Sequence, residues 1–437
     1  MPTDALEGTA GQAAMPYRAT AMACAVACGL APAYTIRWHL GFYPSTLLED
    51  AIAVCLVVFA VDYLSGGRQP VRWRGPFLLP ALVFLLAGVI AVASAPNRVA
   101  ALGLFRAYLV EPIAFAFVLA NVIRTPARAL LLLVGFWAGA TAAGLANSAV
   151  VGAALANHTY DVAQSPPVVI YMTANAVALF VVPLFALAGS LALHGRGWER
   201  LAGGIFSLIG GVVTFLSFSR GGYLALAAVV LGLAISHRRR LALLGLALLG
   251  AGMLSLVPPI RTRVLIETHN VYGNTVASRI DLWTATAHLL RARPLLGAGL
   301  AGFPTRIVPY FSHLHTQANF IDPHNIVLNF WVETGLLGLL AFGWAIGAAM
   351  RVGWRGWRRP AHWWRQYHLG VLLALIALVV HGLVDVPNFK NDLSLEFWAI
   401  LGIAWAGLLW PEPRGDGESA RLGSQPPLGV ELPAAMP

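Results

Sequence analysis

The sequence predicts an all-α, polytopic membrane protein with about 12 transmembrane helices. Apolar residues make up 58% of the 437 residues and glycine adds another 44, whereas charged residues amount to only 11%. An ordinary soluble domain carries about 25% charged residues, so the composition excludes a soluble globular protein and also a disordered chain. The apolar residues are gathered into stretches long enough to cross a bilayer, with short polar connectors between them.

These apolar stretches set the predicted order of the elements. Each stretch suits one membrane-spanning helix, although the first, eighth and ninth are short. The predicted spans are residues 19–36, 46–64, 76–95, 102–122, 127–148, 168–193, 201–219, 222–236, 241–258, 325–350, 367–386 and 393–410. They form a membrane domain over residues 19–410, between a polar N-terminal tail (1–18) and a tail rich in Pro, Gly and polar residues (411–437) that we expect to be disordered.

The basic residues give this domain an orientation. Lys390 is the only lysine, and most arginines fall in the connectors on one side when the spans alternate from a cytoplasmic N-terminus. Cytoplasmic loops are enriched in arginine and lysine, so both termini are predicted to be cytoplasmic. The long connector 259–324 is then extracytoplasmic, and its arginines fit because long loops escape this bias. The positive charge therefore reflects topology, and we expect membrane lipids rather than nucleic acid around it.

Arg220 is the first candidate for function. It follows the seventh predicted span in the run Ser217–Gly222, on the side where arginine is unexpected. A cation held at the membrane boundary usually has a partner or a function. Gly221 and Gly222 would allow a tight turn and would let a ligand approach the backbone. The alternative is that Arg220 balances the carbonyl groups at the end of the preceding helix.

A second candidate cation, Arg279, lies in the long connector. Residues 278–292 are predicted to form an amphipathic helix that begins at Ser278 as the N-cap and rests its apolar side on the membrane surface. That side is expected to be the stripe of Ile280, Trp283, Ala287 and Leu290. Arg279 would be the first helical residue, and a helix N-terminus with a guanidinium group forms an anion site of phosphate size. The alternative is an arginine that reaches toward lipid headgroups.

His324 is the candidate catalytic residue. It stands in the run Asp322–Asn325, where Asp322 is a suitable N-cap and Pro323 fits the first position of the tenth predicted span. The first turn of a helix disfavours a charged imidazolium, and a neutral imidazole can accept a proton as a general base must. The alternative is a polar residue that marks the membrane–water interface.

The remaining polar residues add one candidate and no metal site. Arg106, at the outer end of the fourth predicted span, is a third candidate cation. His381 and Asp385 stand one helical turn apart and are expected to pair with each other. The three cysteines fall within apolar runs and have no matching set of ligands, so no metal site is predicted.

Taken in order, these motifs resemble the O-antigen ligase and O-antigen polymerase superfamily. The motifs are Arg220–Gly222 after a span, Arg279 followed by Trp283 and Pro294–Gly299, and His324–Asn325 leading to Glu333–Gly338. The predicted spans and the long connector between the ninth and tenth also match, so the resemblance covers about residues 20–410.

The resemblance implies a glycosyltransferase of the GT-C kind, embedded in the bacterial inner membrane and independent of metal and cofactor. Its donor would be a glycan on undecaprenyl pyrophosphate, presented at the periplasmic or outer face. Arg220 and Arg279 would hold the pyrophosphate as it leaves. His324 would take the proton from the acceptor hydroxyl, which attacks the anomeric carbon with inversion.

The acceptor is the point on which the resemblance leaves alternatives. In a ligase it is the lipid A core, which is the first reading here. In a polymerase it is another lipid-linked repeat, and in a protein O-oligosaccharyltransferase it is a hydroxyl on a protein. A different class also stays open, in which Arg220, Arg106 and Asp385 line an anion transport path. An enzyme needs the imidazole of His324, whereas a transport path should tolerate glutamine there.

Overall fold

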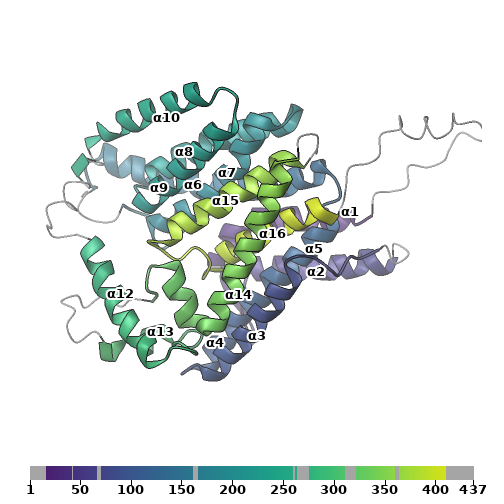
Figure 1. Ribbon diagram of the computed structural model, residues 1–437, viewed down its shortest axis with the longest axis vertical. Coiled ribbons are helices and arrows are strands. Elements are labelled where there is room, and N and C mark those ends of the chain that lie inside the picture. Colours follow the sequence, from purple (N-terminus) through teal and green to yellow (C-terminus); the bar gives the residue numbers. More distant parts are fainter. Residues whose placement is uncertain are drawn as a thin grey trace, which may run out of the picture.

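The computed structural model describes residues 16–41, 43–65, 70–160, 166–258, 261–262, 275–310, 321–359 and 364–409. Over these residues the chain is a bundle of helices with one short two-stranded hairpin (Figure 1). Of the predicted tails, residues 1–15 and the whole of 411–437 lie outside the described residues. Part of the connector 259–324 also lies outside them.

The helices follow one another along the chain with mostly short connections. They are α1 (Arg18–Gly29), α2 (Leu47–Ser65), α3 (Leu78–Ser94), α4 (Arg98–Phe105), α5 (Glu111–Val122), α6 (Pro126–Ala156), α7 (Ala174–His194), α8 (Gly197–Leu216), α9 (Arg220–Ser236), α10 (Arg240–Ser255), α12 (Thr275–Ala292), α13 (Phe303–Arg306), α14 (Ile326–Trp357), α15 (Arg365–Gly382) and α16 (Asn391–Leu409). The strands β1 (Arg37–Leu40) and β2 (Tyr43–Thr46) pair antiparallel, with Arg37 opposite Thr46. A π-helical turn, η2 (Arg106–Val110), joins α4 to α5, and η1 (Ala31–Thr35) and η3 (Val308–Tyr310) are 3₁₀ turns.

Each predicted apolar stretch contains a helix, and the protein is a helical membrane protein. Six helical segments of the described chain are long and apolar enough to cross a membrane: Arg98–Val122, Pro126–Ala156, Ala174–His194, Gly197–Leu216, Ile326–Trp357 and Arg365–Gly382. Helices α1, α3, α9 and the first part of α10 are apolar but shorter. The total of twelve spans therefore stays a prediction.

Helix α7 lies within the bundle and fixes one side of the candidate site. Its most apolar window is 83% buried, the highest share of the six segments. It packs against α8, α15 and α9. The side chain of Thr173 caps its first turn by accepting a hydrogen bond from the N–H of Ala176. A capped and buried helix holds the residues of its first turn in a fixed position.

Helix α14 is bent where the loop after α12 docks on it. Gly335 leaves helical geometry with φ 71° and ψ 178°. Around it, the N–H of Leu336 donates to the carbonyl of Leu295 at 3.0 Å, and the N–H of Ala298 donates to the carbonyl of Val332 at 2.7 Å. These two hydrogen bonds bring the Pro294–Gly299 and Glu333–Gly338 motifs together in space.

A buried carboxylate completes this contact. Glu333 is 5% exposed, and one of its oxygens accepts a hydrogen bond from the N–H of Ala301 at 2.6 Å. The glutamate thus binds backbone of the docked loop, which holds α12 and α14 together in the region of His324. Glu333 lies about two helical turns beyond the start of α14. Residues nine apart on a helix are about 13 Å apart along its axis, so we expect no direct contact between Glu333 and His324.

Substituting Gly335 by alanine is expected to destabilise this junction. A β-carbon there would meet the carbonyl oxygen of Leu295, and φ is in the left-handed region that L-residues avoid. We expect a loss of about 1–3 kcal/mol in the free energy of unfolding, measured by thermal unfolding of the purified protein. Gly343→Ala, in the same helix with nothing within 4 Å of its β-position, is the matched control and should be neutral. Equal stability of the two variants would contradict the docking described above.

Candidate functional site

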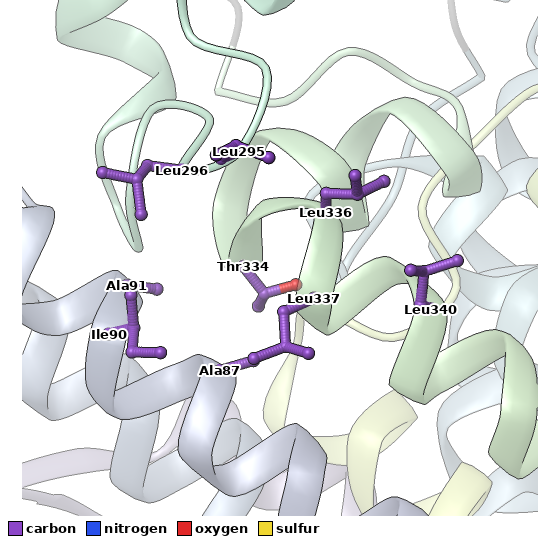
Figure 2. A pocket seen from close by; sticks show the side chains of 9 residues that line it. All are labelled: Ala87, Ile90, Ala91, Leu295, Leu296, Thr334, Leu336, Leu337 and Leu340. Carbon is purple, nitrogen blue, oxygen red and sulfur yellow. The ribbon is translucent and has the colours of Figure 1, made fainter.

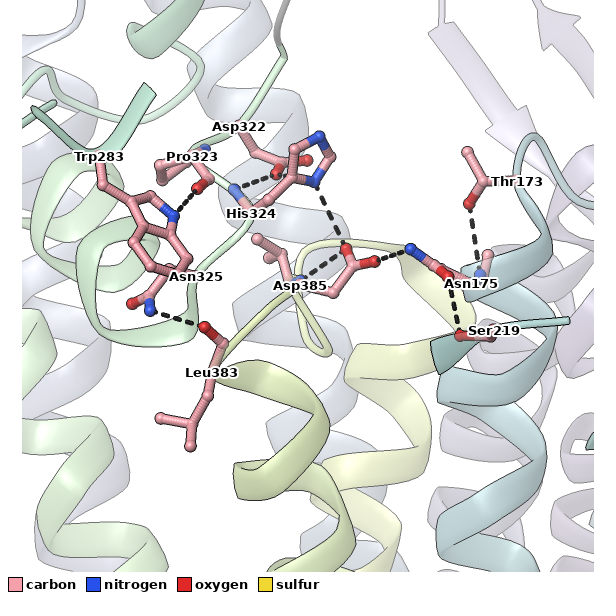
Figure 3. A network of polar contacts seen from close by, with 12 residues as sticks. Thr173, Asn175, Ser219, Trp283, Asp322, Pro323, His324, Asn325, Leu383 and Asp385 are labelled. Atoms are coloured by element: carbon pink, nitrogen blue, oxygen red, sulfur yellow. Dashed lines mark hydrogen bonds and ion pairs between the residues drawn. The ribbon is translucent and has the colours of Figure 1, made fainter. Parts of the chain in front are cut away.

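The candidate site lies where several helix ends meet at one end of the bundle. The starts of α7, α9 and α14 converge there with the segment 383–390 between α15 and α16 (Figure 3). These elements are far apart in sequence but are joined by side-chain contacts, namely two hydrogen bonds and the contact between Asp385 and His324. The opposite ends of the same helices are linked by the arginine-bearing connectors after α7, α9 and α14.

His324 stands just before α14 rather than in its first turn. The helix begins at Ile326, and the N-cap is Asn325, whose side chain accepts hydrogen bonds from the N–H groups of Val327 and Leu328. The prediction that Asp322 caps the helix is therefore wrong, because the amide of Asn325 already satisfies these donors. His324 itself has φ 48°, in the left-handed region that non-glycine residues rarely adopt.

Two carboxylates face the same nitrogen of the His324 ring. The Nδ1 atom lies 3.1 Å from Oδ1 of Asp322 and 3.6 Å from Oδ1 of Asp385. Oδ1 of Asp322 also accepts the backbone N–H of His324 at 2.9 Å, which fixes that carboxylate. Figure 3 shows the other ring nitrogen pointing away from Asp385. The two carboxylates thus orient the imidazole through Nδ1.

The charges around His324 make its imidazole more basic. Burial opposes a charge on the ring, but the hydrogen bond to Asp385 and the charges of Asp322 and Asp385 outweigh burial and raise the pKa of His324 above 6.5. For Asp385, burial is likewise outweighed by the hydrogen bond and charge of His324, which lower its pKa below 3.8. The carboxylates, rather than the dipole of the following helix, dominate the pKa of His324.

Asp385 is held by residues that the sequence pattern did not single out as functional. Its Oδ1 accepts the N–H of Val386 at 2.8 Å, and its Oδ2 accepts the side-chain N–H of Asn175 at 2.7 Å. Oδ1 of Asn175 in turn accepts the hydroxyl of Ser219 at 2.7 Å. The expected pair of Asp385 with His381 is wrong, because α15 ends at Gly382 and Asp385 therefore does not continue the helical face.

Arg220 is the first residue of α9. Ser219 caps that helix by accepting the N–H of Gly222 at 3.1 Å. Arg220 is half-buried, and it follows directly on the Ser219 that binds Asn175. The structure thus brings this cation to the same end of the bundle as His324, at the N-terminus of a helix where the backbone also favours anions.

The two glycines after Arg220 serve packing. Both are buried in the helix, and the left-handed residue of the turn is Phe218 with φ 50°. A β-carbon on Gly221 would meet the ring of His381, and one on Gly222 would meet the β-carbon of Ala178. The expectation that Gly221 and Gly222 open the backbone to a ligand is therefore wrong, because neighbouring helices already occupy that space.

Arg279 lies in the second turn of α12, since the helix begins at Thr275 and not at Arg279. The predicted N-cap at Ser278 is wrong for the same reason. One turn after Arg279, the indole N–H of Trp283 donates to the carbonyl of Pro323 at 2.9 Å. This contact ties the face of α12 that carries Arg279 to the segment of His324. The charge of Arg279 acts on His324 and opposes protonation of its ring.

The buried side of α12 also differs from the prediction. Leu282, Ala285, Leu289 and Leu290 are buried, whereas Ile280 is 54% exposed. The buried residues pack with Ala298, Phe303, Ile307 and Val332 into a small core of their own. The helix therefore buries one apolar side on the docked loop and α14. Of the predicted stripe, Leu290 belongs to this buried side and Ile280 does not, and contact of the stripe with the membrane surface stays a prediction.

Arg106 is neutralised within its own cluster. Its guanidinium lies 2.9 Å from Oε2 of Glu49 and 3.5 Å from Oε1 of Glu111. Glu49 also accepts a hydrogen bond from the side-chain N–H of Asn391 at 2.7 Å. With two carboxylates against it, Arg106 is poorly suited to bind a further anion or to line an anion path.

An apolar cavity of about 320 Å³ lies beside the bend of α14 (Figure 2). It is enclosed by α3, the docked loop and α14 through Ala87, Ile90, Ala91, Leu295, Leu296, Thr334, Leu336, Leu337 and Leu340. The hydroxyl of Thr334 already donates to the carbonyl of Phe330 at 2.7 Å. This cavity offers no charged group and is not the candidate site. Among the described residues, no group of three or more His, Cys, Asp or Glu side chains could hold a metal ion.

Comparison with known families bears on these residues. A family model described as O-antigen ligase matches residues 205–343, from α8 into α14. The matched segment contains Arg220, Arg279 and His324, whereas Asn175 and Asp385 lie outside it. No curated protein matches the chain. At the level of the family, the match indicates a membrane enzyme that transfers glycans. The match over residues 205–343, together with the helical membrane architecture, supports a relationship of this chain to the O-antigen ligase superfamily.

Proposed function

We propose that the protein transfers a glycan from undecaprenyl pyrophosphate to an acceptor hydroxyl, in the manner of an O-antigen ligase with the lipid A core as acceptor. The observation that carries this proposal is the assembly of His324, its two carboxylates, Arg220 and Arg279 at one end of the bundle. This end holds a base and two cations, which are the groups that transfer from a pyrophosphate carrier requires.

The base in this proposal is His324. Its Nδ1 is engaged by Asp322 and Asp385, so Nε2 would take the proton from the acceptor hydroxyl as that oxygen attacks the anomeric carbon. The bond to the pyrophosphate oxygen breaks on the opposite face of the sugar, which inverts the configuration. The imidazolium that forms is stabilised by the two carboxylates, as in other histidine–carboxylate pairs.

The cations in this proposal are Arg220 and Arg279. The leaving group gains negative charge as the glycosidic bond breaks, and a guanidinium can bind two phosphate oxygens at once. Arg220 adds its charge to a helix N-terminus, where backbone dipoles also favour anions. The charge of Arg279 disfavours the protonated form of His324. An anion bound between the two side chains would stabilise both the guanidinium and the imidazolium.

The orientation of this end follows from the arginine distribution. The connectors at the opposite end carry arginines such as Arg196, Arg239 and Arg358, as cytoplasmic segments do. The site would therefore open at the periplasmic or outer face of the inner membrane. Both termini of the chain would lie on the opposite, cytoplasmic side. A lipid-linked donor presented at that face could reach it without crossing the membrane.

The proposal is tested by mass spectrometry of polyprenyl-linked glycans in a strain that lacks the protein. We expect long glycans to accumulate on the carrier because ligation is the blocked step. Accumulation of single repeats would instead assign the protein as the polymerase. An unchanged pool of lipid-linked glycans would contradict glycan transfer altogether. Restoration by the wild-type chain, but not by a His324→Gln chain of equal abundance, would separate catalysis from transport.

A further inference from the structure

We propose that Asn175 is a positioning residue that holds Asp385 against His324 and couples this pair to the start of the helix that carries Arg220. The inference rests on the proposed function, in which His324 is the base. Asn175 lies on α7, outside the segment that the family model matches.

The side chain of Asn175 makes hydrogen bonds to two other elements, the segment after α15 and the start of α9. On one side its amide N–H donates to Oδ2 of Asp385 at 2.7 Å, and Oδ1 of the same carboxylate lies 3.6 Å from Nδ1 of His324. On the other side its Oδ1 accepts the hydroxyl of Ser219 at 2.7 Å. The hydroxyl of Ser219 donates its hydrogen to the amide oxygen of Asn175, so the amide nitrogen is on the side that faces Asp385 (Figure 3).

The hydrogen bond between Asn175 and Ser219 also bears on the position of Arg220. The oxygen of Ser219 is the N-cap of α9, accepting the N–H of Gly222, and Arg220 is the next residue. One amide therefore fixes the start of α9 on one side and the carboxylate partner of His324 on the other. A single shift of Asn175 would displace the base and a proposed pyrophosphate ligand together.

The need for a hydrogen-bond donor at this place is electrostatic. The amide N–H fixes the carboxylate of Asp385 through Oδ2, so that its Oδ1 and its charge stay beside the His324 ring and favour the protonated imidazole. The other groups that act on the pair are Asp322, Arg279 of α12 and His381 of α15. None of these would change in an Asn175 variant, so the effect of the amide can be isolated.

Capping of α7 does not explain Asn175. That role belongs to Thr173, whose side chain accepts the N–H of Ala176. Thr173 is therefore a matched control: Thr173→Ala weakens the same helix start without removing the donor to Asp385. A role limited to the stability of α7 would make both variants behave alike.

The test compares pH–rate profiles of glycan transfer for the full-length wild type, Asn175→Leu and Thr173→Ala in lipid nanodiscs. Without the amide, Asp385 is no longer held against His324 and the ring should lose its proton at lower pH, so we expect the acid limb of the Asn175→Leu profile to move down by about 0.5–1 pH unit. Thr173→Ala should keep the wild-type limb. Ser219→Ala, which frees the amide to rotate, should shift the limb in the same direction by less.

The outcomes separate the inference from the proposed function. An unchanged limb in Asn175→Leu, a shift to higher pH, or an equal shift in Thr173→Ala would each overturn the positioning role. If Asn175→Leu does not fold, the Ser219→Ala profile decides in the same way. If the wild type transfers no glycan, the proposed function fails; the inference is then judged from the NMR titration of the His324 ring, assigned by its loss in His324→Ala.

Discussion

Replacing His324 by alanine is expected to slow glycan transfer by about 10²–10⁴-fold, because a positioned general base contributes this much to a rate. The variant should retain its fold, since the ring is 32% exposed and Asn325 rather than His324 caps α14. The rate should be measured with purified protein in nanodiscs and a lipid-linked glycan donor. In the wild type it should rise with pH through the pKa of His324, which lies above 6.5, because only the neutral ring can accept a proton.

His288→Ala is the matched control for this experiment. His288 lies on the exposed side of α12, in the same connector and away from the two carboxylates. It should leave both the rate and its pH dependence unchanged. A His324→Ala protein of normal abundance that keeps the wild-type rate would show that the histidine is not the base.

Replacing Arg279 or Arg220 by alanine is expected to cost about 10²–10³-fold in rate for each residue, the usual loss when one preorganised charge partner of a leaving group is removed. The loss should appear in the chemical step and also in donor binding, because the pyrophosphate is charged before and after the reaction. Lysine at either position should restore only part of the rate, since an ammonium cannot bind two oxygens in the fixed geometry of a guanidinium.

Two other arginines serve as controls of the same kind. Arg291 is exposed near the end of α12. Arg98 is exposed and is the first residue of α4, just as Arg220 is the first residue of α9. Alanine at Arg291 or Arg98 should leave transfer unchanged. If these controls lose as much activity as Arg279→Ala and Arg220→Ala, the effect would come from general surface charge and not from a pyrophosphate site.

The helices could be predicted from the sequence because their apolar runs are long and separated by polar connectors. Their ends were less predictable. The run Asp322–Asn325 offers two residues able to cap a helix, and the structure uses Asn325 where the pattern favoured Asp322. The start of α12 was missed by four residues because Thr275–Ser278 has no apolar repeat to mark it as helical.

The site residues could be predicted only in part, for a physical reason. Arg220, Arg279 and His324 are unusual where they stand, so each can be noticed alone. Asn175 has no such signal, because it is a single polar residue two positions after the helix cap Thr173. Its proposed role depends on Ser219 and Asp385, which are distant in sequence. Contacts between separate helices are set by tertiary packing, which one sequence does not display.

The most direct test of the central claim is a single-turnover reaction with purified protein, an undecaprenyl-pyrophosphate-linked glycan and an acceptor. We expect the wild type to form undecaprenyl pyrophosphate and glycosylated acceptor in equal amounts. His324→Ala should bind the donor with unchanged affinity but form both products at least about 100-fold more slowly. Equal product formation by the two proteins, or movement of intact donor across the membrane without glycosylated acceptor, would contradict the assignment of this site to glycan transfer.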